Sequence, residues 1–248
     1  MTSTDPADLQ GRVAIITGAT AGIGAAVSEG AAVVLAARRE DRLEAETRRL
    51  TDQGCRALAV RADVTDMADM RALADTTLAE FDRIDILVNN AGVLLASPFT
   101  DANVEEWTRM VQVNVNGVLH GVGAVLPAML EQGGGHIVNL GSVAGRRPFT
   151  GASVYAATKF AVRALSWGMH LDLGQAHGIR VTDIQPGFVS TEILGSLPGE
   201  ARTEWERSWE GLRPLKVEDI ARAVVFAVTA PEHVSVSEVL IRPLDQPA

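Results

Sequence analysis

Short apolar runs alternate with longer helical segments along almost the whole chain, and this alternation constrains the fold more than any other feature. The runs are rich in Val, Ile, Ala and Leu, as expected for strands that are buried on both faces. We predict strands over residues 13–17, 33–37, 57–61, 84–88, 136–140, 179–184 and 239–242. Strands that alternate with helices form parallel sheets with right-handed crossovers. The predicted fold class is therefore α/β, a doubly wound parallel sheet of about seven strands flanked by helices.

Helical segments fill the intervals between these runs, and we predict helices over 40–53, 66–81, about 104–130, 152–177 and 217–229. The stretch 110–130 carries almost no charge. Its Gln, Asn, Gly and Pro residues nevertheless indicate a buried helix rather than a membrane span. No repeat, low-complexity tract or Pro- and Ser-rich linker divides the sequence, so residues 1–248 are predicted to form one domain.

The charge balance and the cysteine count narrow the classes of partner and compartment. The net charge is −9 and the isoelectric point about 5.1, so the basic character expected of a nucleic-acid-binding protein is missing. Cys55 is the only cysteine, which rules out an internal disulfide and fits a reducing compartment. The first residues lack the pattern of a signal peptide. We expect a soluble, cytoplasmic protein that binds neither nucleic acid nor membrane.

A glycine-rich turn follows the first predicted strand, with Gly18, Gly22 and Gly24 ahead of a helix. Glycines in such a turn let the backbone approach a pyrophosphate held at the helix N-terminus. The spacing differs from the common G-x-G-x-x-G pattern, and glycine turns without a ligand are frequent. Its position after the first strand of an alternating chain favours a dinucleotide site.

The end of the second predicted strand indicates which dinucleotide would bind. An acidic residue there holds the ribose hydroxyls of NAD, whereas an arginine accommodates the 2′-phosphate of NADP. The sequence reads Ala37-Arg38-Arg39, and no acid occurs before Glu40. NADP(H) is favoured. The alternative is that both arginines are solvated residues at the start of a helix.

The chemistry is predicted to involve Ser142, Tyr155 and Lys159. Tyr155 is the only tyrosine of the chain, and Lys159 follows four residues later, so on a helix the phenol and the ammonium point into the same space. A nearby ammonium lowers the pKa of a phenol, whose ordinary value is about 10. Tyr155 would act as general acid in carbonyl reduction and as general base in alcohol oxidation. Ser142, after the strand at 136–140, would donate a hydrogen bond to the carbonyl oxygen.

In their order and spacing these motifs resemble the short-chain dehydrogenase/reductase family, and the resemblance covers nearly the whole chain. It rests on Thr17 to Gly24, Asp63, Asn89-Asn90-Ala91-Gly92, Asn114, Ser142, Tyr155-x-x-x-Lys159 and Pro186-Gly187. The resemblance implies a single Rossmann domain that binds NADP(H). The tail over 230–246 is similar to an NADP-dependent branch that includes clavulanic acid dehydrogenase and the serine and 3-hydroxy acid dehydrogenases.

The resemblance also implies roles for individual residues. The catalytic set would be Asn114, Ser142, Tyr155 and Lys159, in which Asn114 helps carry a water-linked proton relay to Lys159. The cofactor would be held by Gly18, Thr20, Ala21, Gly22, Ile23, Gly24, Arg38, Arg39, Asp63, Val64, Asn90, Ala91, Gly92, Tyr155, Lys159, Pro186, Gly187, Val189 and Thr191. The substrate would contact Ser142, Val143, Tyr155 and Phe188. The family is usually a homotetramer built on helices that here span 104–130 and 152–177, and a dimer is the alternative.

These observations predict an NADP-dependent oxidoreductase that acts on CH–OH groups and interconverts an aldehyde or ketone and its alcohol. Three alternatives remain: a ketoacyl reductase, a dehydratase or epimerase on the same scaffold, and a non-catalytic NADP(H)-binding module. The intact set of four residues disfavours the last. His120, His136 and His177 lack metal-ligand spacing, so no metal site is predicted.

The substrate region is predicted around residues 187–215, which resemble a mobile lid over the active site. Arg146 and Arg147 follow Ser142 closely and would attract an anionic substrate, although a surface or interface role is equally compatible with the sequence.

The chain departs from the family pattern between Gly24 and Gly30, where only Ala25-Ala-Val-Ser-Glu29 separates the two glycines. A crossover helix needs about a dozen residues to return along the sheet. We interpret the short interval as an omitted or disordered segment, and the alternative is a real shortening. The intact mass of the protein would decide between them.

Overall fold

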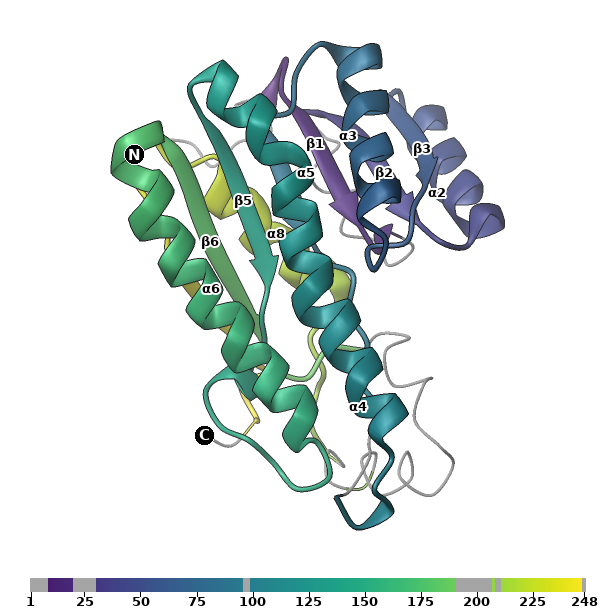
Figure 1. Ribbon diagram of the computed structural model, residues 1–248, viewed down its shortest axis with the longest axis vertical. Coiled ribbons are helices and arrows are strands. Elements are labelled where there is room, and N and C mark those ends of the chain that lie inside the picture. The colour runs from purple at the N-terminus through teal and green to yellow at the C-terminus, as the bar shows by residue number, and fades with distance from the viewer. Residues whose placement is uncertain (1–8, 20–29, 96–98, 191–206, 208–210, 247–248) are drawn as a thin grey trace.

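Seven strands form one parallel sheet in the part of the chain that the structure describes (Figure 1). The computed structural model describes residues 9–19, 30–95, 99–190, 207 and 211–246. The strand order is β3-β2-β1-β4-β5-β6-β7, which confirms the predicted doubly wound α/β sheet. The strands are β1 (Val13–Thr17), β2 (Ala32–Ala37), β3 (Ala57–Arg61), β4 (Ile86–Asn89), β5 (Gly135–Leu140), β6 (Ile179–Pro186) and β7 (Glu238–Ile241).

Helices cover both faces of this sheet. The described helices are α2 (Glu40–Asp52), α3 (Met67–Phe81), α4 (Val104–Val111), the π-helix η4 (Gln112–Asn116), α5 (Gly117–Gln132), α6 (Ser153–His177) and α8 (Val217–Val228). Two short 3₁₀ helices are η3 (Phe99–Asp101) and η5 (Val143–Gly145). Helices α5 and α6 end at Gly133 and Gly178, both in the left-handed conformation that glycine adopts without strain.

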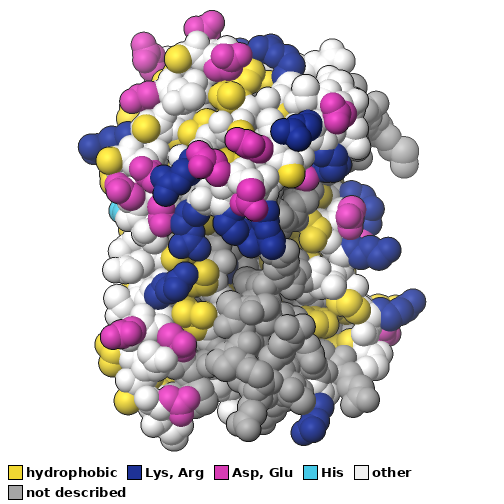
Figure 2. All heavy atoms as spheres, turned by 90° about the vertical axis from the view of Figure 1, so that its right-hand side faces the viewer, with side chains coloured by type: hydrophobic (Ala, Val, Ile, Leu, Met, Phe, Trp, Pro, Cys, Tyr) yellow, Lys and Arg dark blue, Asp and Glu magenta, His cyan; other side chains and the backbone are white. Residues whose placement is uncertain are grey.

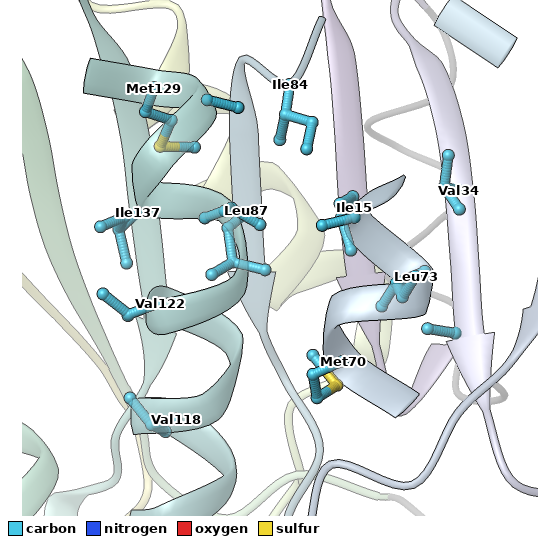
Figure 3. Close-up of a cluster of buried hydrophobic side chains, with 14 of the residues drawn as sticks. Ile15, Val34, Met70, Leu73, Ile84, Leu87, Val118, Val122, Met129 and Ile137 are labelled. Atoms are coloured by element: carbon cyan, nitrogen blue, oxygen red, sulfur yellow. The ribbon is translucent and has the colours of Figure 1, made fainter. Parts of the chain in front are cut away.

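Alternate side chains of each central strand point to opposite faces of the sheet and pack into two separate hydrophobic cores. Ile15 and Val34 pack with residues of α3, α5 and α6, whereas Ile16 and Leu35 pack with residues of α2 and α8. Figure 3 shows apolar side chains of α3 and α5 packed against the face of the sheet that carries Ile15 and Val34. The period of two explains why the strands read as continuous apolar runs. Each fully buried Leu, Ile or Val contributes roughly 1.5–3 kcal/mol to folding.

The predicted elements agree with the structure to within a few residues, with one difference in kind. The helix expected over about 104–130 is interrupted by the π-helix η4, because the hydrophobic spacing in the sequence does not reveal a single turn of wider hydrogen bonding. Strand β4 begins at Ile86 rather than Ile84, since the backbone of Ile84 is bonded by the Gln132 side chain instead of a strand. The interval between Gly24 and Gly30 lies outside the described residues.

The helix from Val104 to Gln132 has the length and the mean hydropathy, 1.4, of a segment able to cross a membrane. In the fold it lies against the sheet and the neighbouring helices α3 and α6 (Figure 1). The packing is close, because a side chain at Gly121 would place its Cβ 2.3 Å from Asn89 Oδ1. Of its most apolar stretch, 39% is buried inside the fold, so the predicted buried helix is buried in part.

The strand order reverses between β1 and β4, and the loops after these two strands meet there. Gly18 has a φ of 62°, and a Cβ on it would lie 2.7 Å from the Cα of Ala91. Asn90 Nδ2 donates to the carbonyl oxygens of Thr17 and Gly18, at 3.0 Å each. In open α/β sheets, ligands bind in the crevice at such a reversal, beyond the carboxyl ends of the strands.

Candidate active site

Ser142, Tyr155 and Lys159 come together at the carboxyl end of β5, and all three are buried. Ser142 caps η5, where its Oγ accepts a hydrogen bond from Ala144 N at 3.1 Å. The Ser142 hydroxyl is near enough to the Tyr155 phenol to favour its ionised form. Lys159 Nζ lies 5.7 Å from the centre of the Tyr155 ring, one helical turn along α6. The residues that the sequence singled out therefore share one site.

The π-helix η4 places Asn114 beside this group. Its side chain binds the backbone of Val93 in both directions, accepting from Val93 N at 2.8 Å and donating to Val93 O at 2.9 Å. It also donates to Thr158 Oγ1 at 3.1 Å, and that hydroxyl donates to Tyr155 O at 2.6 Å. Asn114 thus links the loop after β4 to helix α6. π-helical turns are frequent at functional sites.

Gly92 keeps the space between Asn114 and Lys159 open. A Cβ on Gly92 would lie 3.5 Å from Asn114 Oδ1 and 3.8 Å from Lys159 Nζ. A side chain larger than a methyl group would therefore fill the space beside the lysine. This space lies beyond the carboxyl ends of β4 and β5, where open α/β sheets bind their ligands.

Lys159 is held by a backbone carbonyl. Its Nζ donates to Leu140 O at 2.6 Å, at the end of β5. Burial lowers the pKa of the ammonium to about 8, and the negative charge of Asp183 opposes that shift. Lys159 is therefore mostly protonated at neutral pH, and it loses its charge as the pH rises through about 8.

Tyr155 behaves differently from the sequence-based expectation that a lysine lowers its pKa. Burial raises the pKa of the phenol to about 12, and the nearby Ser142 hydroxyl offsets part of that shift. In the ligand-free protein, removal from water therefore outweighs the nearby ammonium. A phenol that stays protonated at neutral pH is suited to donating a proton.

The two charged residues predicted beside the adenosine half of the cofactor lie across β2 and β3 from each other. Arg38 Nη1 is 3.8 Å from Asp63 Oδ2, and the Arg38 side chain is 54% exposed. Burial alone would raise the pKa of Asp63, but hydrogen bonds from Thr65 and the charges of Arg38 and Arg61 lower it overall. Figure 2 shows basic side chains gathered in the middle of one face of the molecule. A phosphate would find an exposed guanidinium at Arg38.

Other predicted cofactor residues take structural positions around the crevice. Thr17 Oγ1 accepts from Asn90 N and Ala91 N, at 3.1 and 3.2 Å, which fixes the loop after β4. Val64 packs against Gly117 of α5. Arg39 is the N-cap residue of α2. Six predicted residues lie outside the described part of the chain: Thr20, Ala21, Gly22, Ile23, Gly24 and Thr191.

The segment after β6 is held from two sides. Pro186 O accepts from Ser142 Oγ at 3.5 Å, and Gly187 N donates to Ile241 O at 2.7 Å. Phe188 N donates to Gln246 Oε1 at 3.1 Å. Val189 pairs with Leu215 in an isolated bridge. The sequence placed Leu215 in the predicted lid and Gln246 in the tail of the chain, but it did not reveal that both contact the segment after β6, because only the folded chain brings them there.

Arg146, which the sequence offered as an attractor for an anionic substrate, is engaged elsewhere. Its guanidinium binds Gln185 Oε1 and Glu238 Oε2. Among the described residues, no cluster of His, Cys, Asp and Glu has the arrangement of a metal site. His136 is buried, with Nε2 2.8 Å from Thr182 Oγ1, and His120 Nδ1 lies 2.8 Å from Val64 O.

A model of the short chain dehydrogenase family matches residues 12–201 of this chain. The chain is 38% identical over 243 residues to an uncharacterized oxidoreductase of Staphylococcus saprophyticus, covering 96% of this chain and 99% of that protein. It is 40% identical over 245 residues to glycine betaine reductase ATRR of Emericella nidulans, but it spans only 19% of the length of that relative.

Solved structures agree with this similarity. The closed form of a serine dehydrogenase complexed with NADP+ superposes with a TM-score of 0.87 at 35% identity, covering 95% of this chain and 96% of that one. A gluconate 5-dehydrogenase from Burkholderia cenocepacia, in complex with NADP and tartrate, gives a TM-score of 0.85 at 32% identity, with 96% of each chain covered.

The buried state of Tyr155 can be measured directly, because it is the only tyrosine in the chain. In the folded, ligand-free protein we expect almost no ultraviolet tyrosinate absorbance at about pH 10, where an ordinary phenol is half ionised, since the pKa of Tyr155 is raised to about 12. The urea-unfolded protein is the control and should be half ionised there. A half-developed signal from the folded protein at that pH would contradict the prediction.

Proposed function

This chain belongs to the short-chain dehydrogenase/reductase family, and on that premise we propose that it is an NADP(H)-dependent oxidoreductase interconverting an aldehyde or ketone and the corresponding alcohol. The observation that carries the proposal is the buried group of Tyr155, Ser142 and Lys159 at the carboxyl ends of the strands. A non-catalytic module would have no need for a protonated phenol placed beside a hydroxyl and an ammonium.

The proposed chemistry divides between the cofactor and the chain. The nicotinamide ring, when bound, supplies or takes up the hydride at the substrate carbon. In reduction, Tyr155 donates its phenolic proton to the substrate oxygen, and Ser142 stabilises the negative charge that develops there by a hydrogen bond. Lys159 holds a positive charge near the phenolate that remains and so favours that state. Asn114 fixes the loop beside Lys159 and would support proton return.

The cofactor is NADP(H) in this proposal because the end of β2 carries Arg38 and no acid of its own, and the Arg38 side chain stays 54% exposed beside Asp63. The serine dehydrogenase and the gluconate 5-dehydrogenase that resemble this chain contain NADP in their structures. In this proposal Gly18, Asn90 and Gly92 would contact the cofactor from one side, and Pro186 and Gly187 from the other.

The substrate is proposed to lie against Ser142, Val143, Tyr155 and Phe188. Most of the predicted lid at about 187–215 lies outside the described residues. The engagement of Arg146 by Gln185 and Glu238 removes one support for an anionic substrate. Reduction of a ketoacyl group remains an alternative within the same chemistry. The cytoplasmic location stays a prediction.

We propose assembly into a homotetramer, or a dimer, through helices α5 and α6. Apolar side chains stand exposed on these helices, which is the character of an interface rather than of a solvated surface. They are Leu119, Leu130, Phe160, Trp167 and Leu171. Light scattering of wild type and Leu171→Glu tests this, with a smaller particle expected for the variant. A wild-type monomer would contradict it.

We expect Tyr155→Phe to reduce carbonyl turnover by about a hundredfold to ten-thousandfold, since it removes the proton donor without removing the ring. NADPH binding, measured by the fluorescence of the nicotinamide, should change little. Turnover is followed as NADPH oxidation with a panel of aldehydes and ketones. Near-wild-type turnover by the variant would refute the role of Tyr155.

We expect Arg38→Ala to weaken NADPH binding about tenfold or more while leaving NADH binding nearly unchanged, because a charged hydrogen bond to phosphate contributes about 1.5–3 kcal/mol. The matched control is Arg48→Ala, an arginine further along α2. Equal losses for both cofactors would show that Arg38 acts on the fold rather than on the 2′-phosphate.

A further inference from the structure

Four polar side chains lie in one row across the sheet, on the face covered by α5 and α6. The strand register aligns Asn89 of β4, Asn139 of β5, Asp183 of β6 and Glu238 of β7. The row two residues earlier on the same face is apolar and consists of Leu87, Ile137 and Val181. A polar row of this kind is costly to bury unless its members are paired.

Two parts of the row have partners, although Asn89 Oδ1 has none within the described part of the chain. Asn89 Nδ2 donates to Asn139 Oδ1 at 2.9 Å, and Asn139 Nδ2 donates to Ser166 Oγ of α6 at 2.8 Å. At the other end, Glu238 Oε1 accepts a hydrogen bond from Arg163 Nε at 2.7 Å. Glu238 is also bound by the guanidinium of Arg146. Between these parts lies Asp183.

Asp183 is 1% exposed, and only one of its two carboxylate oxygens is hydrogen-bonded within the described part of the chain. Oδ2 accepts from Gln185 Nε2 at 2.6 Å. Oδ1 points toward Gly141, where a Cβ would lie 2.3 Å from it. Gly141 directly follows Leu140, whose carbonyl oxygen receives the Lys159 ammonium. The free oxygen of Asp183 is thus aimed at the strand end that holds Lys159.

Lys159 is the main positive charge that acts on the Asp183 carboxylate. The charged groups acting on Asp183 are Lys159 and Arg163 from α6 and Glu238 from β7. Arg163 shares the single carboxylate of Glu238 with Arg146, and its charge acts on Asp183 less strongly than that of Lys159 does. Burial raises the pKa of Asp183 to about 6 and lowers that of Lys159 to about 8, and in both cases the charge of the other residue opposes the shift.

We propose that Asp183 is a positioning residue that keeps Lys159 in its ammonium form inside the protein. Leu140 O alone supplies a hydrogen-bond acceptor but no net charge, whereas the carboxylate supplies the counter-charge that a buried ammonium needs. Gln185 and Arg146 fix the carboxylate to the segment that follows Ser142. The effect on catalysis rests on the proposed role of Lys159. The charge coupling itself does not.

The chain is suited to a direct test, because Lys159 and Lys216 are its only lysines. Protein labelled with ¹³C at lysine Cε gives two signals, and Lys216 at the start of α8 provides the internal reference. In Asp183→Asn we expect the pKa of Lys159 to fall by about one pH unit below its wild-type value. An unchanged value in the folded variant would overturn the proposal.

The matched control is Asp85→Asn, which neutralises a second buried aspartate. Asp85 binds Arg83 and Val13 N at the opposite end of the sheet. This variant should leave the Lys159 titration as in wild type. An equal fall in both variants would show a general loss of structure and would overturn the specific role of Asp183.

A wild-type measurement decides the question even if Asp183→Asn does not fold. The Lys159 signal should show a small step near pH 6, where Asp183 takes up a proton, in addition to its own titration. Absence of that step would overturn the proposal. Because neither measurement uses substrate or turnover, the outcome is independent of whether the proposed oxidoreductase activity is found.

Discussion

Parallel pairing of all seven strands is the constraint on which the site depends. It sends the carboxyl end of every strand to the same edge of the sheet, so residues far apart in the chain become neighbours there. Ser142 follows β5 and Pro186 ends β6, and the two are joined by a hydrogen bond. Thr17 and Asn90 meet in the same way after β1 and β4. Helix α6 then needs only to cross this edge to bring its tyrosine and lysine to the assembled loops.

Removal from water dominates the electrostatics of this edge. A phenol loses more by ionising in a buried site than a nearby ammonium returns, so Tyr155 keeps its proton in the free protein. The same burial weakens the charge of Lys159. Both residues are therefore shifted toward their neutral forms. A positively charged ring bound beside them would favour the phenolate, which suits a group that must release and recover a proton.

Much of this arrangement could be predicted from the sequence, because the strong signals are local. Strand β1 was predicted at its observed limits, since continuous apolar runs mark buried strands. Helical spacing predicted that Tyr155 and Lys159 lie on the same face of a helix. The position of Arg38 was predicted from its place at the end of a strand. The roles of these residues remain proposals, but their positions were accessible from the order of residues alone.

The remainder depends on contacts that no local pattern reveals. The π-helix that carries Asn114 has the same apolar spacing as an ordinary helix. The part that Thr158 takes in the site is shown only by its hydrogen bond to Asn114. Asp183 lies at the strand end that holds Lys159 only through the register of β5 and β6. The same register places the Asp183 carboxylate against Gly141. A carboxylate at 183 and a side chain at 141 would occupy the same volume, so a larger residue in place of Gly141 would displace the carboxylate and with it the charge near Lys159.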